Sequence, residues 1–341
     1  MSRLLFVVLL AGGVLCTVVA GISFGSEPIV FADVLATLGL RLGFVETANL
    51  PPGVEEIVWD LRLPRVMLAG LVGGGLAVIG VAMQALVRNP LAEPYILGVS
   101  AGASTGASLF YLGFLPPLIS KALSMPLAAF IGALAAMTIV YLVARSESSM
   151  NTGRLLLAGV AVSALLAATT SFITYASPDP HRVRAVLFWM LGSFSGARWD
   201  LLALPAFASV GGCLVLVALA RALDALLLGD EPALSLGITV ESTKKLLILI
   251  TAFTTGSLVS VSGIIGFVGL IIPHAVRLIS GVTHRRLVPV SYAVGAVFLV
   301  WADLAARALI PHEELPVGIL TAICGVPFFL VLLRGSKQVF A

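Results

Sequence analysis

Residues 63–86 read LPRVMLAGLVGGGLAVIGVAMQAL, an apolar stretch in which Arg65 is the only charged residue. A helix needs about 20 mostly apolar residues to cross the hydrocarbon core of a bilayer. Gly70 and Gly74 are four residues apart, a spacing that lets two helices approach closely in lipid. The stretch therefore predicts a membrane-spanning helix that packs tightly against its neighbours.

The same pattern recurs along the whole chain. Of its 341 residues, 59% are hydrophobic and only 11% are charged, whereas soluble domains carry about 25% charged residues. Ten apolar stretches are long enough, or nearly so, to cross a membrane: 5–24, 63–86, 95–112, 124–144, 155–175, 200–220, 244–263, 266–282, 287–309 and 317–334. The sequence predicts an all-α polytopic membrane protein with about ten transmembrane helices, in a single domain over residues 1–341.

The positions of Lys and Arg indicate the orientation. If both termini are cytoplasmic, 12 of the 20 basic residues lie on the inner side and 11 of the 17 acidic residues lie outside. Cytoplasmic loops carry an excess of Lys and Arg, so this orientation is favoured over its inverse.

Two segments lie between the apolar stretches. Residues 25–61 carry several prolines and acids and are predicted to form an external loop. Residues 221–243, RALDALLLGDEPALSLGITVEST, are predicted to be cytoplasmic, and their regularly spaced Leu and Ala residues indicate short amphipathic helices. From composition alone, such helices rest on lipid headgroups or dock onto a partner protein.

The sequence lacks several motifs that would indicate an enzyme. It contains no G-x-x-x-x-G-K-[ST] phosphate loop, so we expect no ATPase site in this chain. Its cysteines and histidines do not have the spacing of a metal site, and we expect no metal or cofactor. Asp303 and Arg307 are ionisable groups inside an apolar stretch, and their spacing of four residues allows them to pair.

Seven motifs resemble, in the same order, those of the FecCD/BtuC-like family of ABC importer permeases. They are RLPR (62–65), MQALVRNPLAEPYILGVSAG (83–102), RLLLAGVA (154–161), FWMLGSFSG (188–196), GIIGFVGLIIPHAVR (263–277), ADLAAR (302–307) and ELPVGILTA (314–322). The resemblance covers about residues 55–335. Several long motifs in one order are far more specific than any single glycine pattern.

The resemblance implies the BtuC-like (type II) fold, in which a homodimer surrounds a central path in the bacterial cytoplasmic membrane. It also implies two ATPase subunits, which bind ATP and Mg on the cytoplasmic side, and a soluble or lipid-anchored binding protein outside. The expected cargo is a metal chelate: a ferric siderophore first, then haem or cobalamin. The expected surroundings are membrane lipid, with no nucleic acid.

The resemblance also assigns roles to individual residues. Arginines on the outer face would contact acidic residues of the binding protein, and the matching positions are Arg62, Arg65 and Arg307. The segment LGDEPALSLG (228–237) is similar to the coupling helices that dock onto the ATPase, with the role falling on Gly229, Asp230, Ala233 and Gly237. An inner gate would be formed by Asn89, Leu91, Thr152 and Gly153.

Two other classes of function stay open. One is a proton-coupled secondary transporter that works through Asp303, because charge at membrane depth is costly and usually functional. The other is a structural membrane protein without transport activity.

Overall fold

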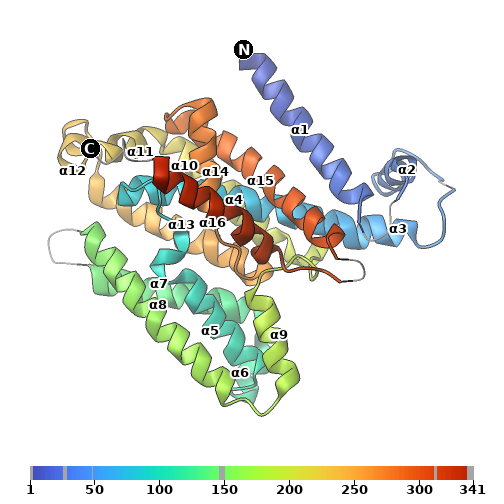
Figure 1. Ribbon diagram of the computed structural model, residues 1–341, viewed down its shortest axis with the longest axis horizontal. Coiled ribbons are helices and arrows are strands. Elements are labelled where there is room, and N and C mark those ends of the chain that lie inside the picture. Colours follow the sequence, from blue (N-terminus) through green and yellow to red (C-terminus); the bar gives the residue numbers. More distant parts are fainter. Residues whose placement is uncertain (1–2, 26–28, 48, 146–149, 311–312, 336–341) are drawn as a thin grey trace.

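The computed structural model describes residues 3–25, 29–47, 49–145, 150–310 and 313–335, and these residues form a helical bundle (Figure 1). Each of the ten predicted apolar stretches overlaps at least one helix. The helices are α1 (Arg3–Ser23), α2 (Phe31–Arg41), α3 (Val54–Glu56), η1 (Ile57–Arg62), α4 (Leu63–Val87), η2 (Pro94–Leu97), α5 (Val99–Tyr111), α6 (Pro117–Ala122), α7 (Met125–Ala144), α8 (Thr152–Tyr175), α9 (Pro180–Met190), η3 (Trp199–Leu201), α10 (Ala203–Ala218), α11 (Ala220–Leu227), α12 (Asp230–Ser235), α13 (Val240–Ser262), α14 (Val268–Ser280), α15 (His284–Ala308) and α16 (Val317–Gly335).

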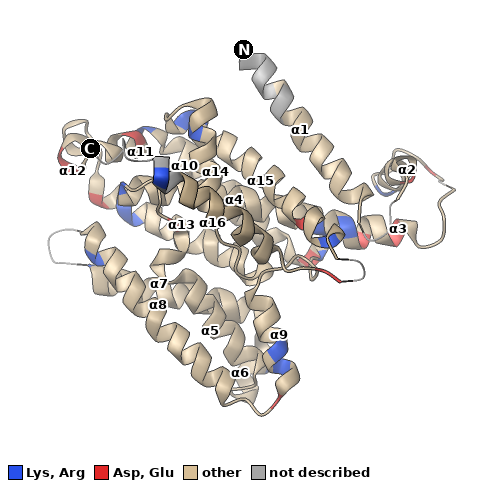
Figure 2. Cartoon of the chain, viewed as in Figure 1, with Lys and Arg blue, Asp and Glu red and all other residues tan. Residues whose placement is uncertain are grey.

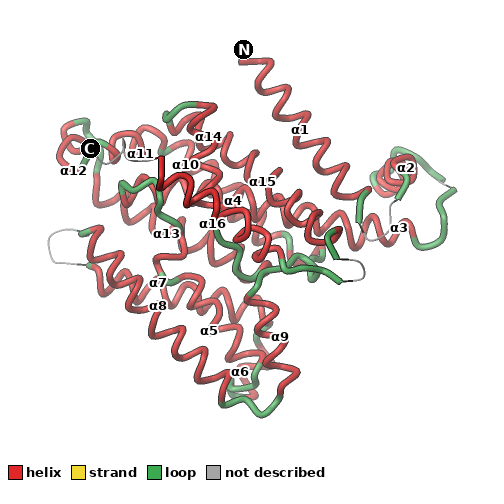
Figure 3. The backbone as a smooth tube through the Cα atoms, in the orientation of Figure 1, coloured by secondary structure: helices red, strands yellow, loops and turns green. Residues whose placement is uncertain are grey.

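Within the described residues, six helical segments are long and apolar enough to cross a membrane. They are Val54–Val87, Met125–Ala144, Thr152–Tyr175, Trp199–Ala218, Val240–Ser262 and His284–Ala308. Shorter apolar helical segments occupy Ala11–Ser23, Val268–Ser280 and Val317–Val331. The tube in Figure 3 shows that loops mainly join helix ends. The fold is thus that of an all-α, multi-pass membrane protein, as predicted.

Two of the predicted stretches are not continuous spans. Residues 95–112 begin as the short η2, turn at Gly98 with a φ of 82°, and continue as the 13-residue α5. Pro94 and the left-handed conformation of Gly98 prevent one uninterrupted helix. Residues 266–282 likewise become helical only at Val268, after Phe267 adopts a φ of 69°. Both half-length helices therefore start inside the bundle after a turn.

Residues 25–61, predicted as an external loop, are helical over part of their length. They contain α2, and residues 54–62 are helical and continuous with α4, so that one helical segment runs from Val54 to Val87. Glu55 pairs with Arg41 of α2 at 2.7 Å, which connects α2 to this helical extension.

Helix α4 lies at the centre of the bundle and is buried along most of its length. A Cβ atom on Gly73 would collide with the backbone of Gly295 in α15, and one on Gly80 would collide with the backbone of Gly269 in α14. Helices α5, α7, α8 and α9 form a second group beside it (Figure 1). Charged residues gather mostly at two opposite ends of the bundle, one of them formed by α11, α12 and the start of α13 (Figure 2).

Candidate transport sites

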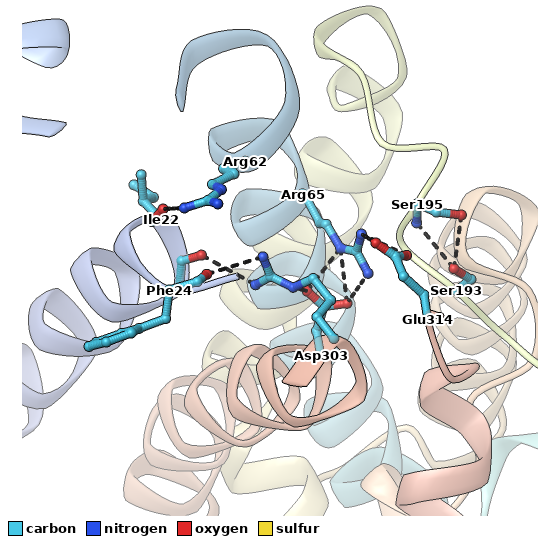
Figure 4. Close-up of polar contacts among 10 residues, drawn as sticks. Ile22, Phe24, Arg62, Arg65, Ser193, Ser195, Asp303 and Glu314 are labelled. Atoms are coloured by element: carbon cyan, nitrogen blue, oxygen red, sulfur yellow. Dashed lines mark hydrogen bonds and ion pairs between the residues drawn. The ribbon is translucent and has the colours of Figure 1, made fainter. Parts of the chain in front are cut away.

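Four buried residues, Arg62, Arg65, Asp303 and Arg307, form a group with the partly exposed Glu314, here called the arginine cluster (Figure 4). Arg65 donates from Nε and Nη2 to the Asp303 carboxylate at 2.9–3.1 Å, and from Nη1 to both oxygens of Glu314 at 2.9 and 3.0 Å. Arg307 Nε forms an ion pair with Asp303 Oδ2 at 3.2 Å. This confirms the predicted pairing of Asp303 with Arg307 and adds Arg65 to it.

The other guanidinium donors of the cluster bind the C-terminal end of α1. Arg62 Nη1 donates to the carbonyl oxygens of Ile22 and Ser23 at 2.8 and 3.0 Å. Arg307 donates to the carbonyl oxygens of Gly21 and Phe24 at 3.2 and 3.4 Å. The last carbonyls of a helix have no partners within it and carry partial negative charge, so cationic donors stabilise this end.

The burial of these arginines differs from the open outer surface on which the docking prediction places them. Arg62, Arg65 and Arg307 are only 7–9% exposed. Buried guanidinium groups need partners, and carboxylates and helix carbonyls meet that need here. The side chain of Glu314, at 47% exposure, is the part of the cluster that solvent reaches. The docking role itself stays a prediction.

The predicted coupling segment, residues 221–243, contains α11 and α12, followed by the start of α13. Helix α12 begins at Asp230, so Pro232 falls in its first turn, where proline is tolerated. Ala233 is fully buried, whereas Leu234 and Leu236 are exposed by 58% and 64%. Gly237 has a φ of 81°, and a Cβ atom added there would meet no neighbour. The two leucines therefore form an exposed apolar edge.

Asp230 makes ion pairs within the chain. Its Oδ2 accepts a hydrogen bond from Lys244 Nζ at 2.6 Å, and its Oδ1 accepts one from Arg88 Nη2 at 3.3 Å. Gly229, with a φ of 116°, lies beside the same arginine. Lys244 and Arg88 were not among the residues assigned a role from the sequence, because 14 and 142 positions separate them from Asp230.

The first predicted gate turn, residues 88–93, follows α4. Arg88 ends the helix in the left-handed conformation with a φ of 55°. The side chain of Asn89 accepts a hydrogen bond from the Leu91 N–H at 2.9 Å, which closes a tight turn. Asn89 is exposed and Leu91 is partly exposed.

The second predicted gate turn, residues 150–153, precedes α8. Asn151 Oδ1 accepts hydrogen bonds from the N–H groups of Gly153 and Arg154 at 2.8 and 3.2 Å, which makes Asn151 the N-cap of α8. Thr152 and Gly153 are thus the first residues of the helix. The N–H of Met150 donates to Glu241 Oε1 of α13 at 3.0 Å.

Glu93 and Tyr95 connect the first gate turn to the break before α14, and sequence reasoning assigned them no role. Glu93 Oε1 accepts a hydrogen bond from the N–H of Phe267 at 2.6 Å. Tyr95 Oη donates to the Ile265 carbonyl at 2.9 Å. Burial raises the pKa of the Glu93 carboxyl, and the bond from Phe267 opposes that rise. The sequence feature that could have identified Glu93 is its position as a single acid next to Pro94 in an otherwise apolar stretch.

An apolar cavity of about 390 Å³ lies beside the same break. Its lining includes Met190, Ile264, Phe267, Gly318 and Ile319. It is bounded by the end of α9, the turn before α14 and the start of α16. The N–H of Val317 donates to the Gly192 carbonyl at 2.9 Å, which holds the start of α16 close to the end of α9.

The chain is similar to known membrane permeases along nearly its whole length. Residues 13–335 match the model of the FecCD transport family. The Cobalamin import system permease protein BtuC of Halobacterium salinarum is 44% identical over 87% of this chain and 77% of its own length. The Hemin transport system permease protein HmuU of Yersinia pestis is 43% identical over 82% of this chain and 84% of its own.

A solved structure agrees with the fold. It is described as an inward-facing conformation of a transporter assigned to the metal-chelate ABC type. It aligns with a TM-score of 0.81 and 28% identity over 95% of this chain and 97% of the other. The helical arrangement described above is therefore that of a membrane permease of the ABC transporter type.

Proposed function

The chain belongs to the FecCD transport family, and from this premise we propose that it is the permease subunit of an ABC importer that moves a metal chelate across the cytoplasmic membrane. The observation that carries the proposal is the family match over residues 13–335, together with relatives named as cobalamin and hemin permeases. The chain would act as a homodimer with both termini cytoplasmic, and two partner ATPase subunits would supply the energy.

We propose that the coupling segment docks onto the ATPase. The exposed Leu234 and Leu236 support this, since a pair of large apolar side chains on a short helix and its C-terminal turn fits a protein groove. Gly229, Asp230, Ala233 and Gly237 would shape this segment: the two glycines adopt left-handed conformations, Ala233 packs inside and Asp230 pairs with Lys244. Their contribution to docking would thus be largely indirect.

We propose that the arginine cluster marks the docking face for the binding protein. Glu314 is the partly exposed carboxylate on Arg65, so an acid of the partner would compete with it for the same guanidinium. Arg62 and Arg307 would contribute by holding α1 and by making the local potential positive.

The best candidate cargo is a ferric siderophore, with haem and cobalamin after it. Arg182 and Arg184 of α9 are exposed and would attract an anionic chelate. Arg182 pairs with Asp179 at 3.2 Å, which reduces this attraction. Met190 lines the apolar cavity at the end of the same helix, whereas His181 lies at its exposed start. The apolar lining of this cavity would favour a bulky chelate over a bare ion.

Proton coupling through Asp303 is disfavoured by the geometry of the arginine cluster. Both carboxylate oxygens of Asp303 are bound by guanidinium groups. Protonation of Asp303 would leave Arg65 and Arg307 buried with less compensating charge, and this cost opposes a proton cycle.

Reconstitution tests the proposed function. The purified chain alone in proteoliposomes should take up no chelate, while addition of a cognate ATPase, a binding protein and Mg-ATP should produce uptake of a ferric siderophore, hemin or cobalamin. Uptake by the chain alone along a proton gradient would indicate the secondary transporter. No uptake in any combination, with a folded complex, would indicate a structural protein.

Leu91 is expected to line a constriction at the dimer axis. In a background that lacks Cys16, Cys213 and Cys324, Leu91→Cys should crosslink across the homodimer with a short reagent in one nucleotide state and much less in another, because a stiff turn moves as a body. Val143→Cys, at an exposed position near the end of α7, is the control for crosslinking that does not involve the gate turn. Equal crosslinking of Leu91→Cys in every nucleotide state would exclude it as a gate.

A further inference from the structure

Asp230 of α12 and the start of α13, with Glu241 and Lys244, together contact both gate turns. Lys244 donates to Asp230 of the coupling segment at 2.6 Å. Glu241 accepts a hydrogen bond from the Met150 N–H of the second gate turn at 3.0 Å. The first gate turn joins through Arg88, which binds the other oxygen of Asp230 at 3.3 Å. The first gate turn is thus attached to Asp230 and the second to Glu241, and the Lys244–Asp230 ion pair joins these two attachment points.

These contacts differ in how firmly they are held. The Lys244 side chain is only 3% exposed, so its ammonium group depends on the Asp230 carboxylate for charge compensation. The side chains of Arg88 and Asp230 are 40% and 41% exposed, and a pair so accessible to solvent contributes little to stability. Lys244 with Asp230 is therefore the fixed part, and the Arg88 and Glu241 contacts are attachments to it.

The position of each attachment along the backbone matters for movement. Arg88 is the residue at which α4 ends in a left-handed conformation, directly before Asn89. Met150 directly precedes Asn151, the N-cap of α8. Each attachment thus holds a gate turn at the point where it meets its helix.

We propose that Asp230 of α12 and the start of α13 form a relay that transmits movement of α12 to both gate turns, with Arg88 and Glu241 as positioning residues. The proposal rests on the proposed function. A displacement of α12 would move Lys244 with it through the ion pair to Asp230, and the two attachments would then shift residues 88–93 and 150–153 together. One docking event could in this way act on two turns that come from separate helices.

Distances between spin labels test the relay in the protein itself. In the cysteine-free background, one label pair is placed at Leu91 and Leu236 and a second at Thr152 and Leu236, with excess unlabelled protein to dilute distances between copies. Arg88→Gln should broaden the distance distribution of the first pair and leave the second unchanged. Glu241→Ala should broaden the second pair and leave the first unchanged, because each attachment serves one turn.

Matched variants separate the relay from a general loss of structure. Arg154→Gln removes a guanidinium at the start of α8 that contacts no acid among the described residues, and it should alter neither distance. Arg88→Lys keeps the cation and Glu241→Gln keeps an acceptor oxygen, so the distance distributions of these two variants should stay narrow. If Arg88→Gln and Glu241→Ala leave both distributions narrow, or broaden both equally, the relay does not exist.

Transport provides a second, independent measurement. In the reconstituted complex, Arg88→Gln should preserve ATP hydrolysis but lower the chelate transported per ATP by roughly two- to fivefold, as expected for the loss of one exposed ion pair. Unchanged transport per ATP would overturn the relay. If the wild-type complex shows no ATP-driven uptake at all, the proposed function fails, while the label distances still report whether the turns are joined.

Discussion

Asp303→Ala is expected to cost about 3–5 kcal/mol of stability, the typical effect of removing one partner from a buried ion pair. Asp303 is 1% exposed and compensates both Arg65 and Arg307. Without it, the guanidinium groups of Arg65 and Arg307 would remain buried, and among the described residues Glu314 would be the one acid left in contact with Arg65. The melting temperature in detergent and the yield of monodisperse protein should both fall markedly.

Asp200→Ala is the matched control for this prediction. Asp200 also binds an arginine through two hydrogen bonds, from Arg198 at 2.9 and 3.1 Å. Their side chains are 68% and 64% exposed, so the pair should contribute no more than about 1 kcal/mol. Similar melting temperatures for the two variants would show that the arginine cluster does not stabilise the bundle.

Gly80→Ala is expected to disrupt the packing of α4 against α14. The added methyl group would overlap the backbone carbonyl of Gly269, which cannot move aside as a flexible side chain can. The same carbonyl accepts a hydrogen bond from Gln84 at 3.2 Å, so any displacement would also disturb that contact. Overpacking of this kind costs about 1–3 kcal/mol or more, and we expect a lower melting temperature and loss of transport.

Gly211→Ala distinguishes this collision from a general effect of glycine replacement. Gly211 lies within α10, and a Cβ atom there would have no neighbour within 4 Å. Because alanine favours helix more than glycine does, this variant should be neutral or slightly more stable. Equal behaviour of the two variants would contradict the close contact at Gly80.

The sequence allowed the helices to be placed more reliably than their interruptions. Apolar stretches of about 20 residues reveal a span by composition alone, and α4, α7 and α8 match the prediction closely. The break at Gly98 was missed because the apolar pattern continues across it. Mean hydropathy over a window of residues indicates whether a segment prefers lipid or water. The φ of 82° at Gly98 depends on the local backbone instead, so hydropathy does not reveal it.

Local pairs were likewise more predictable than distant ones. The contact of Asp303 with Arg307 follows from a spacing of four residues within one helix. The contact of Arg65 with Asp303 joins residues 238 positions apart, and nothing in either stretch identifies the other. The burial of the predicted docking arginines follows from these distant partners, so it could be recognised only once the helices were placed in space.

The attachment of α1 also has a consequence for the order of biosynthesis. The carbonyl oxygens of Gly21 and Phe24 emerge from the ribosome early, but the Arg307 donors that bind them are synthesised more than 280 residues later. Until then, water must satisfy these groups at the membrane surface. The nascent α1 therefore obtains its complete set of hydrogen bonds only after the segment containing Arg307 has been inserted. Completion of this contact is a late step of assembly, and incomplete chains would lack it.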